Sequence, residues 1–374
     1  MSKKDSMGIG RIRFLYVSRL FNRSGYLVLR HLLEKGRHVP SCVLLPECEA
    51  AHPLDDPARA EAERERYRKE CDFYGNRPLR FLESIRRLAQ SSGIEVLEMK
   101  TIKGCDSEDR LKSLQFDLIA LGGGWPELVP AGVIRLPRLG VVNTHPSLLP
   151  EFRGTDVHRW QVFHGVRESG TTIHYVDETF DTGNILSQVA VPIVAEDCPQ
   201  ELATKAAEAA GPLMEETLER VSHNDPGRVP SASQPDRSDA RRYFSRWRWE
   251  DPDFMRLDWT QPAESLYRFV LACTQESYRY NGPFFQVRGR SYLLRTSSLT
   301  PHDGSGMPGE VVRMEAGGVV VRCGGDRNAL RLMQIQRSSE EERRNQFHQD
   351  PAFLAEEAAR AAEFSVGDNL NEVR

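Results

Sequence analysis

Asn143, His145 and Asp181 are residues of the types that acyl transfer to an amine requires, and each stands beside turn-forming residues. A carboxylate can take a proton from an attacking amine, while an imidazole and an amide can stabilise the oxyanion that develops. Asn143 and His145 are two residues apart after a short apolar run, so they could project the same way from a strand end. These residue types and their spacing indicate a centre for acyl transfer.

Each of these residues also has a purely structural explanation. An Asn and a His at a strand end can satisfy the backbone groups of a loop, and Asp181 lies in a Phe-Asp-Thr-Gly turn, where Asp is common for local reasons. Spacing alone therefore leaves catalysis and turn formation open.

The sequences around these residues give further evidence of function. NTHPSLLPEFRG, at 143–154, is followed by FDTGNIL, at 180–186. These two stretches closely resemble the signature of the formyltransferases that use 10-formyltetrahydrofolate, in which an Asn-x-His pair before Ser-Leu-Leu-Pro is followed by an Asp-x-Gly. The resemblance covers residues 11–222 well and residues 254–337 more loosely.

The resemblance implies a role for each residue of the catalytic set. Asn143 would hold the formyl oxygen through its amide, and His145 would donate a hydrogen bond to the oxyanion or protonate it. Asp181 would be the base or proton relay for the incoming amine. A raised pKa would suit that task near neutral pH, although no feature of the sequence demonstrates one. In the same segment, Arg153 would support the site or contact an anionic group.

The folate side of the site is expected in GGGWPELVP, at 122–130, which follows a predicted strand. Consecutive glycines allow a backbone to approach a flat ligand closely, and a tight strand-to-loop turn explains them equally well. By resemblance this loop lies on the pterin side of the folate site. The residues expected at the cofactor are Gly122, Gly123, Gly124, Leu128, Val129 and Ser147.

Other chemistries lack their signatures. The sequence contains no HExxH, no paired CxxC and no GxSxG, so neither a metal nor a nucleophilic serine is expected. No glycine fingerprint follows the first predicted strand, which argues against a nicotinamide cofactor. His174 alternates with apolar residues and is expected to be a buried structural histidine. His158 and His164 flank Trp160 on a predicted helix and are expected to be surface or packing residues.

Length and composition bound the class of protein. A chain of 374 residues predicts two domains with extensions, and the 39% hydrophobic and 28% charged content is ordinary for a globular protein. No apolar run approaches the ~20 residues of a membrane span, and the N-terminus has no apolar core of a secretory signal. Seven dispersed cysteines suggest reduced thiols, so we expect a cytoplasmic protein without a membrane partner.

The order of elements predicts an α/β fold. A strand at 11–18, a helix at 23–36 and a strand at 38–45 form a β-α-β opening, which argues for a parallel sheet. Later short β-like runs separated by glycines suggest a small barrel. With the resemblance, we expect a Rossmann-like parallel-sheet catalytic domain followed by an OB-like β-barrel. The expected division is 11–222 catalytic domain, 223–253 linker, 254–337 OB-like domain and 338–374 charged tail, helical or disordered.

The sequence identifies the acceptor amine less clearly than it identifies the reaction. Relatives formylate methionyl-tRNA, nucleotide-linked amino sugars, glycinamide ribonucleotide and other amines. Residues 254–337 contain eleven Arg and no Lys against seven Asp and Glu, a weaker basic character than nucleic-acid binding usually shows. EFRGTDVHRW, at 151–160, also departs from the wording typical of tRNA formyltransferases. These features favour a small-molecule acceptor, such as an amino-sugar nucleotide or a natural-product intermediate, with methionyl-tRNA as the alternative.

Further alternatives stay open. Water could replace the amine in a formyltetrahydrofolate hydrolase, although hydrolases of this kind usually carry an N-terminal regulatory domain for which residues before 11 leave no room. A folate-binding regulatory protein without turnover would not need all three polar residues. The charge-mixed insertion at 52–74 is typical of a solvated helix face, with gating of the acceptor site as the alternative. A homodimer is compatible with the family.

Overall fold

The structure is a computed structural model of the chain. Gly124 and most of the 52–74 insertion lie outside the residues that it describes. The described residues are 12–47, 60–62, 64–65, 68–69, 83–123, 125, 127–223, 231–234, 243–274, 282–315, 318–325, 327–338 and 363–371.

The catalytic half is built on a seven-stranded sheet with the strand order β3-β2-β1-β4-β5-β6-β7. The first five strands of this order are parallel, whereas β6 is antiparallel to β5, and β7 to β6. The predicted parallel sheet is therefore confirmed. The strands are β1 (Phe14–Val17), β2 (Cys42–Pro46), β3 (Glu95–Met99), β4 (Leu118–Leu121), β5 (Val141–His145), β6 (Glu168–Tyr175) and β7 (Ile185–Pro192).

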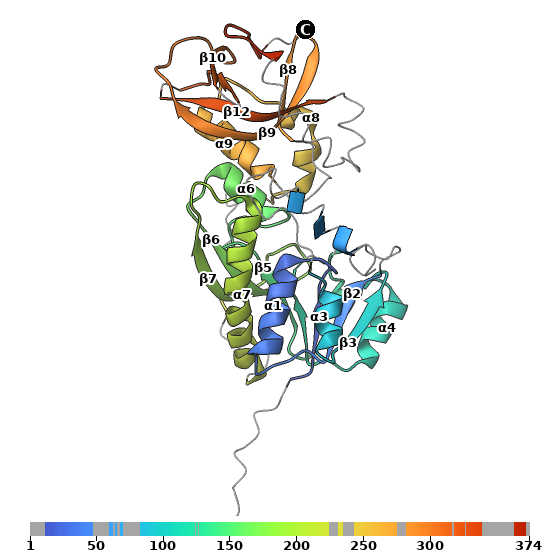
Figure 1. The fold of residues 1–374 in the computed structure, drawn as a ribbon. Helices are drawn as coiled ribbons and strands as arrows, with labels where there is room; N and C mark the ends of the chain where they lie inside the picture. The colour runs from blue at the N-terminus through green and yellow to red at the C-terminus, as the bar shows by residue number, and fades with distance from the viewer. Residues whose placement is uncertain are drawn as a thin grey trace, which may run out of the picture.

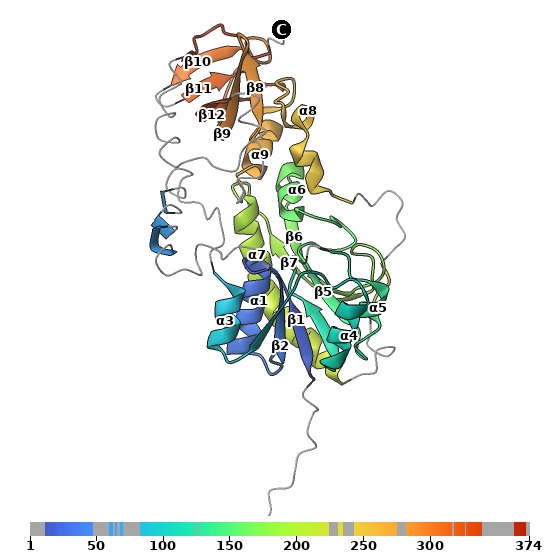
Figure 2. The same cartoon turned by 90° about the vertical axis from the view of Figure 1, so that its right-hand side faces the viewer.

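Helices cover both faces of this sheet (Figures 1 and 2). Helices α1, α3 and α7 share a buried cluster on one face, while α4 and α5 contribute to the cluster on the other. Helix α1 begins where the side chain of Asn22 accepts a hydrogen bond from the backbone of Gly25, and its apolar side chains face the sheet. The helices are α1 (Arg23–Glu34), α3 (Ile85–Ser91), α4 (Cys105–Ser113), α5 (Ala131–Ile134), α6 (Val157–His164) and α7 (Pro199–Ser222).

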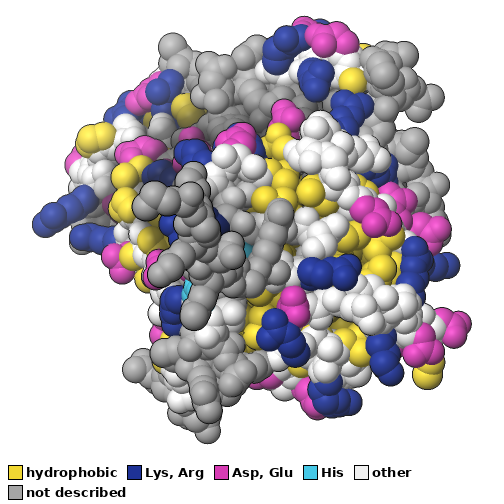
Figure 3. Space-filling model, turned by 90° about the horizontal axis from the view of Figure 1, so that it is seen from below, with side chains coloured by type: hydrophobic (Ala, Val, Ile, Leu, Met, Phe, Trp, Pro, Cys, Tyr) yellow, Lys and Arg dark blue, Asp and Glu magenta, His cyan; other side chains and the backbone are white. Residues whose placement is uncertain are grey.

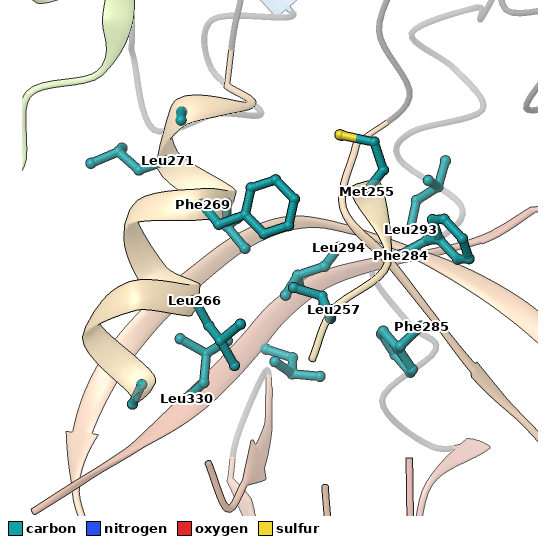
Figure 4. Packing of buried hydrophobic residues seen from close by; sticks show 14 of the residues in the cluster. Met255, Leu257, Leu266, Phe269, Leu271, Phe284, Phe285, Leu293, Leu294 and Leu330 are labelled. Carbon is teal, nitrogen blue, oxygen red and sulfur yellow. The ribbon is translucent and has the colours of Figure 1, made fainter. Parts of the chain in front are cut away.

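The C-terminal half is a five-stranded antiparallel sheet with the order β10-β11-β12-β9-β8. Apolar residues from helix α9, from the segment before it and from the strands pack together in its core (Figure 4). The small β-domain predicted from the glycine-separated runs is confirmed. Its elements are η2 (Arg246–Glu250), α8 (Pro252–Met255), α9 (Ala263–Ala272), β8 (Phe284–Val287), β9 (Arg290–Pro301), β10 (Val311–Glu315), β11 (Gly318–Val321) and β12 (Asn328–Ser338).

The two halves share one hydrophobic cluster. Trp160 of α6 and Leu202 of α7 are buried in the same cluster as Trp249 and Phe269 of the C-terminal half. The guanidinium of Arg159 is fully buried there, 3.9 Å from the ring centroid of Trp249. Burial of this continuous apolar surface favours a fixed contact between the halves, which meet at α6 and α9 (Figure 1).

The segment 363–371 packs against the C-terminal sheet. Phe364 and Leu370 are buried in its core, and the backbone of Val311 exchanges hydrogen bonds of 2.8 Å with Asp368 and Gly367. The expectation of a helical or disordered tail after residue 338 is therefore wrong for these residues. Their two buried apolar side chains and the unpaired edge of β10 outweigh the charged composition of the tail.

The stretch expected to be a linker, 223–253, also makes specific contacts. Ala232 pairs with Ile185 of β7, the backbone of Phe244 bridges to Gly154, and Trp249 is fully buried. Its Pro- and Ser-rich composition indicated a connection between domains but gave no sign that the connection would bind both of them.

Charges on the described surface are mixed. On the face seen in Figure 3, Lys and Arg side chains are interspersed with Asp and Glu, in keeping with the net charge of -4. In the described part of the insertion, exposed Arg68 pairs with Glu61 at 3.0 Å and with Glu65 at 2.8 Å, as expected for a solvated helix face. Among the described helices, none has the length and apolar character to cross a membrane.

Replacing Phe364 by Ala should lower the free energy of unfolding of the C-terminal half by about 3–5 kcal/mol, the usual result of truncating a buried aromatic residue. The Phe364 side chain is 4% exposed, and its ring centroid lies 5.2 Å from that of Tyr292. Urea unfolding followed by tryptophan fluorescence measures the change. Val366→Ala is the control, because Val366 is 63% exposed in the same segment; equal losses in both variants would contradict the packing described.

Candidate active site

The end of β5 and the turn between β6 and β7 bring the three expected catalytic residues together. The Nδ1 atom of His145 lies 3.4 Å from Oδ1 of Asp181. Asn143 joins them through a fourth residue, because its Nδ2 lies 3.1 Å from Nε2 of His174, which lies 3.6 Å from Asp181 Oδ1. The register of β5 and β6, which pairs Asn143 with His174, produces this arrangement.

His174 is the residue whose part in the site the sequence did not indicate. It is buried, as expected, and its Nδ1 lies 2.8 Å from the carbonyl oxygen of Tyr175. Because a carbonyl can only accept, Nδ1 carries a proton and donates to it, and Nε2 lies between the amide of Asn143 and the carboxylate of Asp181. His174 therefore joins the side chain of Asn143 to that of Asp181.

Both ring nitrogens of His145 face acceptor oxygens. Its Nε2 donates to the carbonyl oxygen of Phe152 at 2.8 Å, which turns Nδ1 toward Asp181. Burial by itself lowers the pKa of His145, but the charge and hydrogen bond of Asp181 act in the opposite direction and leave the pKa raised. The pair thus favours a protonated imidazole beside an ionised carboxylate.

Asp181 is ionised in this arrangement. Burial would raise its pKa, but the charges and hydrogen bonds of His145 and His174 outweigh burial, and the pKa is well below its usual range. The backbone N–H of Gly154 donates to its Oδ2 at 2.9 Å. The raised pKa that would have suited a base is therefore not what the structure gives. Instead, the ionised carboxylate of Asp181 is placed to stabilise a positive charge.

The turn that carries Asp181 has a demanding backbone. Asp181 has a φ of 56°, in the left-handed region, and the carboxylate of Asp177 accepts from Thr179 N at 3.1 Å and from Thr182 Oγ1 at 2.7 Å. A Cβ at Gly183 would lie 1.8 Å from the carbonyl oxygen of Tyr175. The Asp-Thr-Gly sequence therefore has a structural explanation in the turn.

The expected cofactor residues fall into two groups. Leu128 and Val129 line a cavity of about 320 Å³ that also includes Glu178 of the Asp181 turn. Ser147 instead donates to the carbonyl oxygen of Glu151 at 2.6 Å, within its own loop. Among the described residues, the cavity is lined by Lys103, Gly104, Leu128, Val129, Pro130, Ala131 and Glu178.

The two described glycines of the 122–130 loop have structural explanations. A Cβ at Gly122 would lie 2.0 Å from the hydroxyl of Tyr16, and Gly123 has a φ of 90°. The same construction at Gly123 would place a Cβ 3.8 Å from the carbonyl oxygen of Thr144, between Asn143 and His145. The loop therefore runs beside the catalytic end of β5, and Gly124 lies outside the described residues.

The neighbouring histidines differ from one another. His158 has its Nε2 buried without a hydrogen-bond partner among the described residues. Burial lowers the pKa of His158 to about 3, with the charges of His145 and Arg23 acting in the same direction, so the ring is neutral beside the site. His164 stacks on Trp160 with ring centroids 6.0 Å apart, which confirms the expected packing role. Within the described residues, no group of His, Cys, Asp and Glu could hold a metal ion.

Comparison with known proteins agrees with this geometry. Residues 85–218 match the family described as formyl transferase, and residues 251–347 match the formyl transferase C-terminal domain. The methionyl-tRNA formyltransferase of Pseudomonas paraeruginosa is 31% identical over 253 residues, which make up 68% of this chain and 76% of that protein. The chain belongs to the formyltransferase family, whose members are enzymes that use formyl-tetrahydrofolate.

Solved structures share the fold. An N-formyltransferase from Helicobacter canadensis, in complex with folinic acid and dTDP-3-aminofucose, has a TM-score of 0.58 at 16% identity and covers 87% of this chain and 99% of its own. HypX from Aquifex aeolicus, in complex with tetrahydrofolic acid, has a TM-score of 0.52 at 18% identity and covers 89% of this chain and 45% of its own. At these identities the likeness concerns the fold.

Replacing Asp181 by Asn should lower the pKa of His145 below its ordinary value, because burial remains while the negative charge is lost. Titration of the histidine ring protons by NMR measures this change, with His145→Gln protein used to assign the resonance. An unchanged pKa of His145 would show that Asp181 does not set its protonation.

Proposed function

We propose that this chain transfers the formyl group of 10-formyltetrahydrofolate directly to a primary amine of a small-molecule acceptor. The observation that carries the proposal is the buried His145–Asp181 pair, joined to Asn143 through His174, in a member of the formyltransferase family. These groups match the needs of a tetrahedral intermediate, which develops negative charge on oxygen and positive charge on nitrogen.

In the proposed reaction, the amine nitrogen attacks the formyl carbon and the carbonyl electrons move onto the oxygen. Asn143 donates to that oxygen, the positive charge of protonated His145 stabilises it, and the carboxylate of Asp181 stabilises the ammonium and relays its proton. The bond from the formyl carbon to N10 of the folate then breaks, and N10 takes up a proton. The products are the N-formyl amine and tetrahydrofolate, so protons and electrons balance.

The folate is assigned to the cavity beside the Asp181 turn. Leu128 and Val129 provide an apolar lining, and Glu178 connects the cavity to the catalytic turn. A concave, partly apolar site with a few polar groups suits a flat pterin ring. The complexes of the structural neighbours with folinic acid and tetrahydrofolic acid support a folate of this class.

A small acceptor, such as an amino-sugar nucleotide or a natural-product intermediate, is favoured by charge and by the surface near the site. The net charge of -4 gives little attraction for a large nucleic acid. Phe180, next to Asp181, and Tyr243 are 49% and 51% exposed, with ring centroids 5.7 Å apart. Exposed aromatic rings beside a catalytic turn suit the stacking of a planar group, such as the base of a nucleotide-linked amine.

Methionyl-tRNA is the second candidate acceptor. The observation in its favour is the 31% identity to the enzyme of Pseudomonas paraeruginosa, which is named a methionyl-tRNA formyltransferase. We propose a cytoplasmic location for the protein with either acceptor. The five described cysteines form no disulfides, which supports this location.

Asp181→Ala should lower kcat by about 100- to 10,000-fold, the range for loss of a group that moves protons in the transition state. Release of tetrahydrofolate with a reactive amine measures the loss, and circular dichroism verifies folding. Asp303→Ala is the control, since Asp303 also lies in a turn, with its carboxylate accepting from the backbone of Ser305, but is in the C-terminal half. Near-normal turnover by folded Asp181→Ala protein would reject the mechanism.

The acceptor is tested by measuring tetrahydrofolate release from 10-formyltetrahydrofolate with methionyl-tRNA in one arm and a panel of amino-sugar nucleotides in the other. We expect acceleration by a small amine. Acceleration by charged tRNA alone would make translation initiation the function and overturn the preference for a small acceptor. Equal release without any amine would instead indicate a hydrolase, and folate binding without turnover would indicate a regulatory protein.

A further inference from the structure

The turn that carries Asp181 is held by a residue from the connection between the two domains. The Nε2 atom of Gln234 donates to the carbonyl oxygens of Asp181 and Gly183, each at 2.8 Å. These two carbonyls belong to the residues on either side of Thr182, shortly before β7 begins at Ile185. One side-chain amide therefore fixes the backbone on both sides of Thr182 and, with it, the direction in which the Asp181 carboxylate leaves the chain.

The other end of the same amide binds the second catalytic loop. Oε1 of Gln234 accepts from Nε of Arg153 at 3.1 Å and from Nη2 at 2.6 Å. Arg153 precedes Gly154, whose N–H donates to Oδ2 of Asp181 at 2.9 Å. Gln234 thus connects the loop after β5 to the Asp181 turn. The loop after β5 also contacts the Asp181 carboxylate directly, through the N–H of Gly154.

Backbone bonds on either side keep this segment in place. Ala232 and Ile185 exchange two hydrogen bonds of 2.8 Å each. Further along, Phe244 N donates to the carbonyl oxygen of Arg153, and Thr155 N donates to the carbonyl oxygen of Phe244, each at 2.9 Å. The described parts of the connection are therefore bound to the catalytic half both before and after the gap at 235–242.

We propose that Gln234 is a positioning residue for formyl transfer, which holds the Asp181 carboxylate against His145 by fixing the carbonyls of Asp181 and Gly183. The inference rests on the proposed function of the site. Gln234 itself has no part in moving protons, and its effect on turnover passes through the placement of Asp181.

The position of the Asp181 carboxylate matters because the backbone of Asp181 is left-handed and its Oδ1 lies 3.4 Å from Nδ1 of His145, at the long end of hydrogen-bond distances. A displacement on the order of 1 Å in a reacting group can lower turnover by about 100-fold. Loss of the two carbonyl bonds removes the contacts that oppose such a displacement, while the cavity at Leu128 and Val129 does not include Gln234.

Gln234→Met keeps the length of the side chain but can neither donate to the carbonyls nor accept from Arg153. We expect kcat to fall by about 10- to 100-fold, with KM for folate and for the amine changed by less than about twofold. Binding of 5-formyltetrahydrofolate, measured by calorimetry, should be unchanged. A merely structural role would instead lower the melting temperature without this separation of kcat from KM.

Gln336→Met is the matched control. Gln336 is buried in the C-terminal sheet, and its Oε1 accepts from Nε of Arg295 at 3.0 Å and from Nη2 at 2.8 Å. This variant removes the same kind of Arg–Gln pair away from the Asp181 turn, so it should change stability and leave kcat within about twofold of the unaltered protein.

A second readout does not depend on the acceptor. Asp181, Arg153, His158 and His174 are the groups that act on or face His145, and of these Asp181 raises its pKa. Gln234→Met should therefore lower the pKa of His145 measured by NMR, toward the value in Asp181→Asn protein. This result would support the positioning of Asp181 even if no amine in the panel were formylated.

Gln234→Glu distinguishes the contacts of the side-chain oxygen from those of the side-chain nitrogen. It is the variant to measure if the Met variant does not fold. Glutamate keeps the bond with Arg153 but cannot donate to the carbonyls, so kcat should fall as in the Met variant. Turnover near normal in a folded Gln234 variant, a loss confined to KM, or an equal loss in Gln336→Met would each overturn the proposal.

Discussion

The carboxylate of Asp181 is a charge held away from water, and much of the catalytic half is arranged around the groups that stabilise it. An isolated buried carboxylate would be neutral, because the energetic cost of removing its charge from water is large. Here His145 and His174 face one oxygen, and the N–H of Gly154 donates to the other. Each group comes from a different segment, so β5, β6 and the loop after β5 must be in register before the charge is stable.

This requirement explains why several features near the site serve folding and chemistry together. Gly183 is needed because Tyr175 lies against it, and Gly154 has a φ of 105° with the backbone of Phe244 close by. The same two glycines let the Asp181 turn and the loop after β5 approach each other. His174 is fixed by the carbonyl of Tyr175 and in turn fixes Asn143. Hydrogen bonds and close backbone contacts therefore hold the polar groups of the site in place, which is what preorganised electrostatic stabilisation needs.

The features that could be predicted from the sequence are those that depend on residues close together in the chain. Apolar runs and helical spacing depend on near neighbours, so strands β1 and β2 and helix α1 were expected close to where they lie. The family motif predicted that Asn143, His145 and Asp181 lie in one site. Gln234 could not be found in this way, since its partners are about fifty residues distant and only the folded chain brings them together. The packing of Phe364 was hidden for the same reason, because two apolar residues in a charged segment form no local pattern.

The segment that completes the C-terminal sheet also bears on how the chain is made. Domains fold as units during synthesis, generally in order from the N-terminus. The catalytic sheet can form once β7 and α7 have left the ribosome, with residues 231–244 following soon after. The C-terminal core, however, includes Leu370 and needs residues 363–371 to pair with the edge of β10. During translation the C-terminal core therefore closes later than the catalytic sheet, and its apolar side chains stay incompletely covered until residues 363–371 have been made.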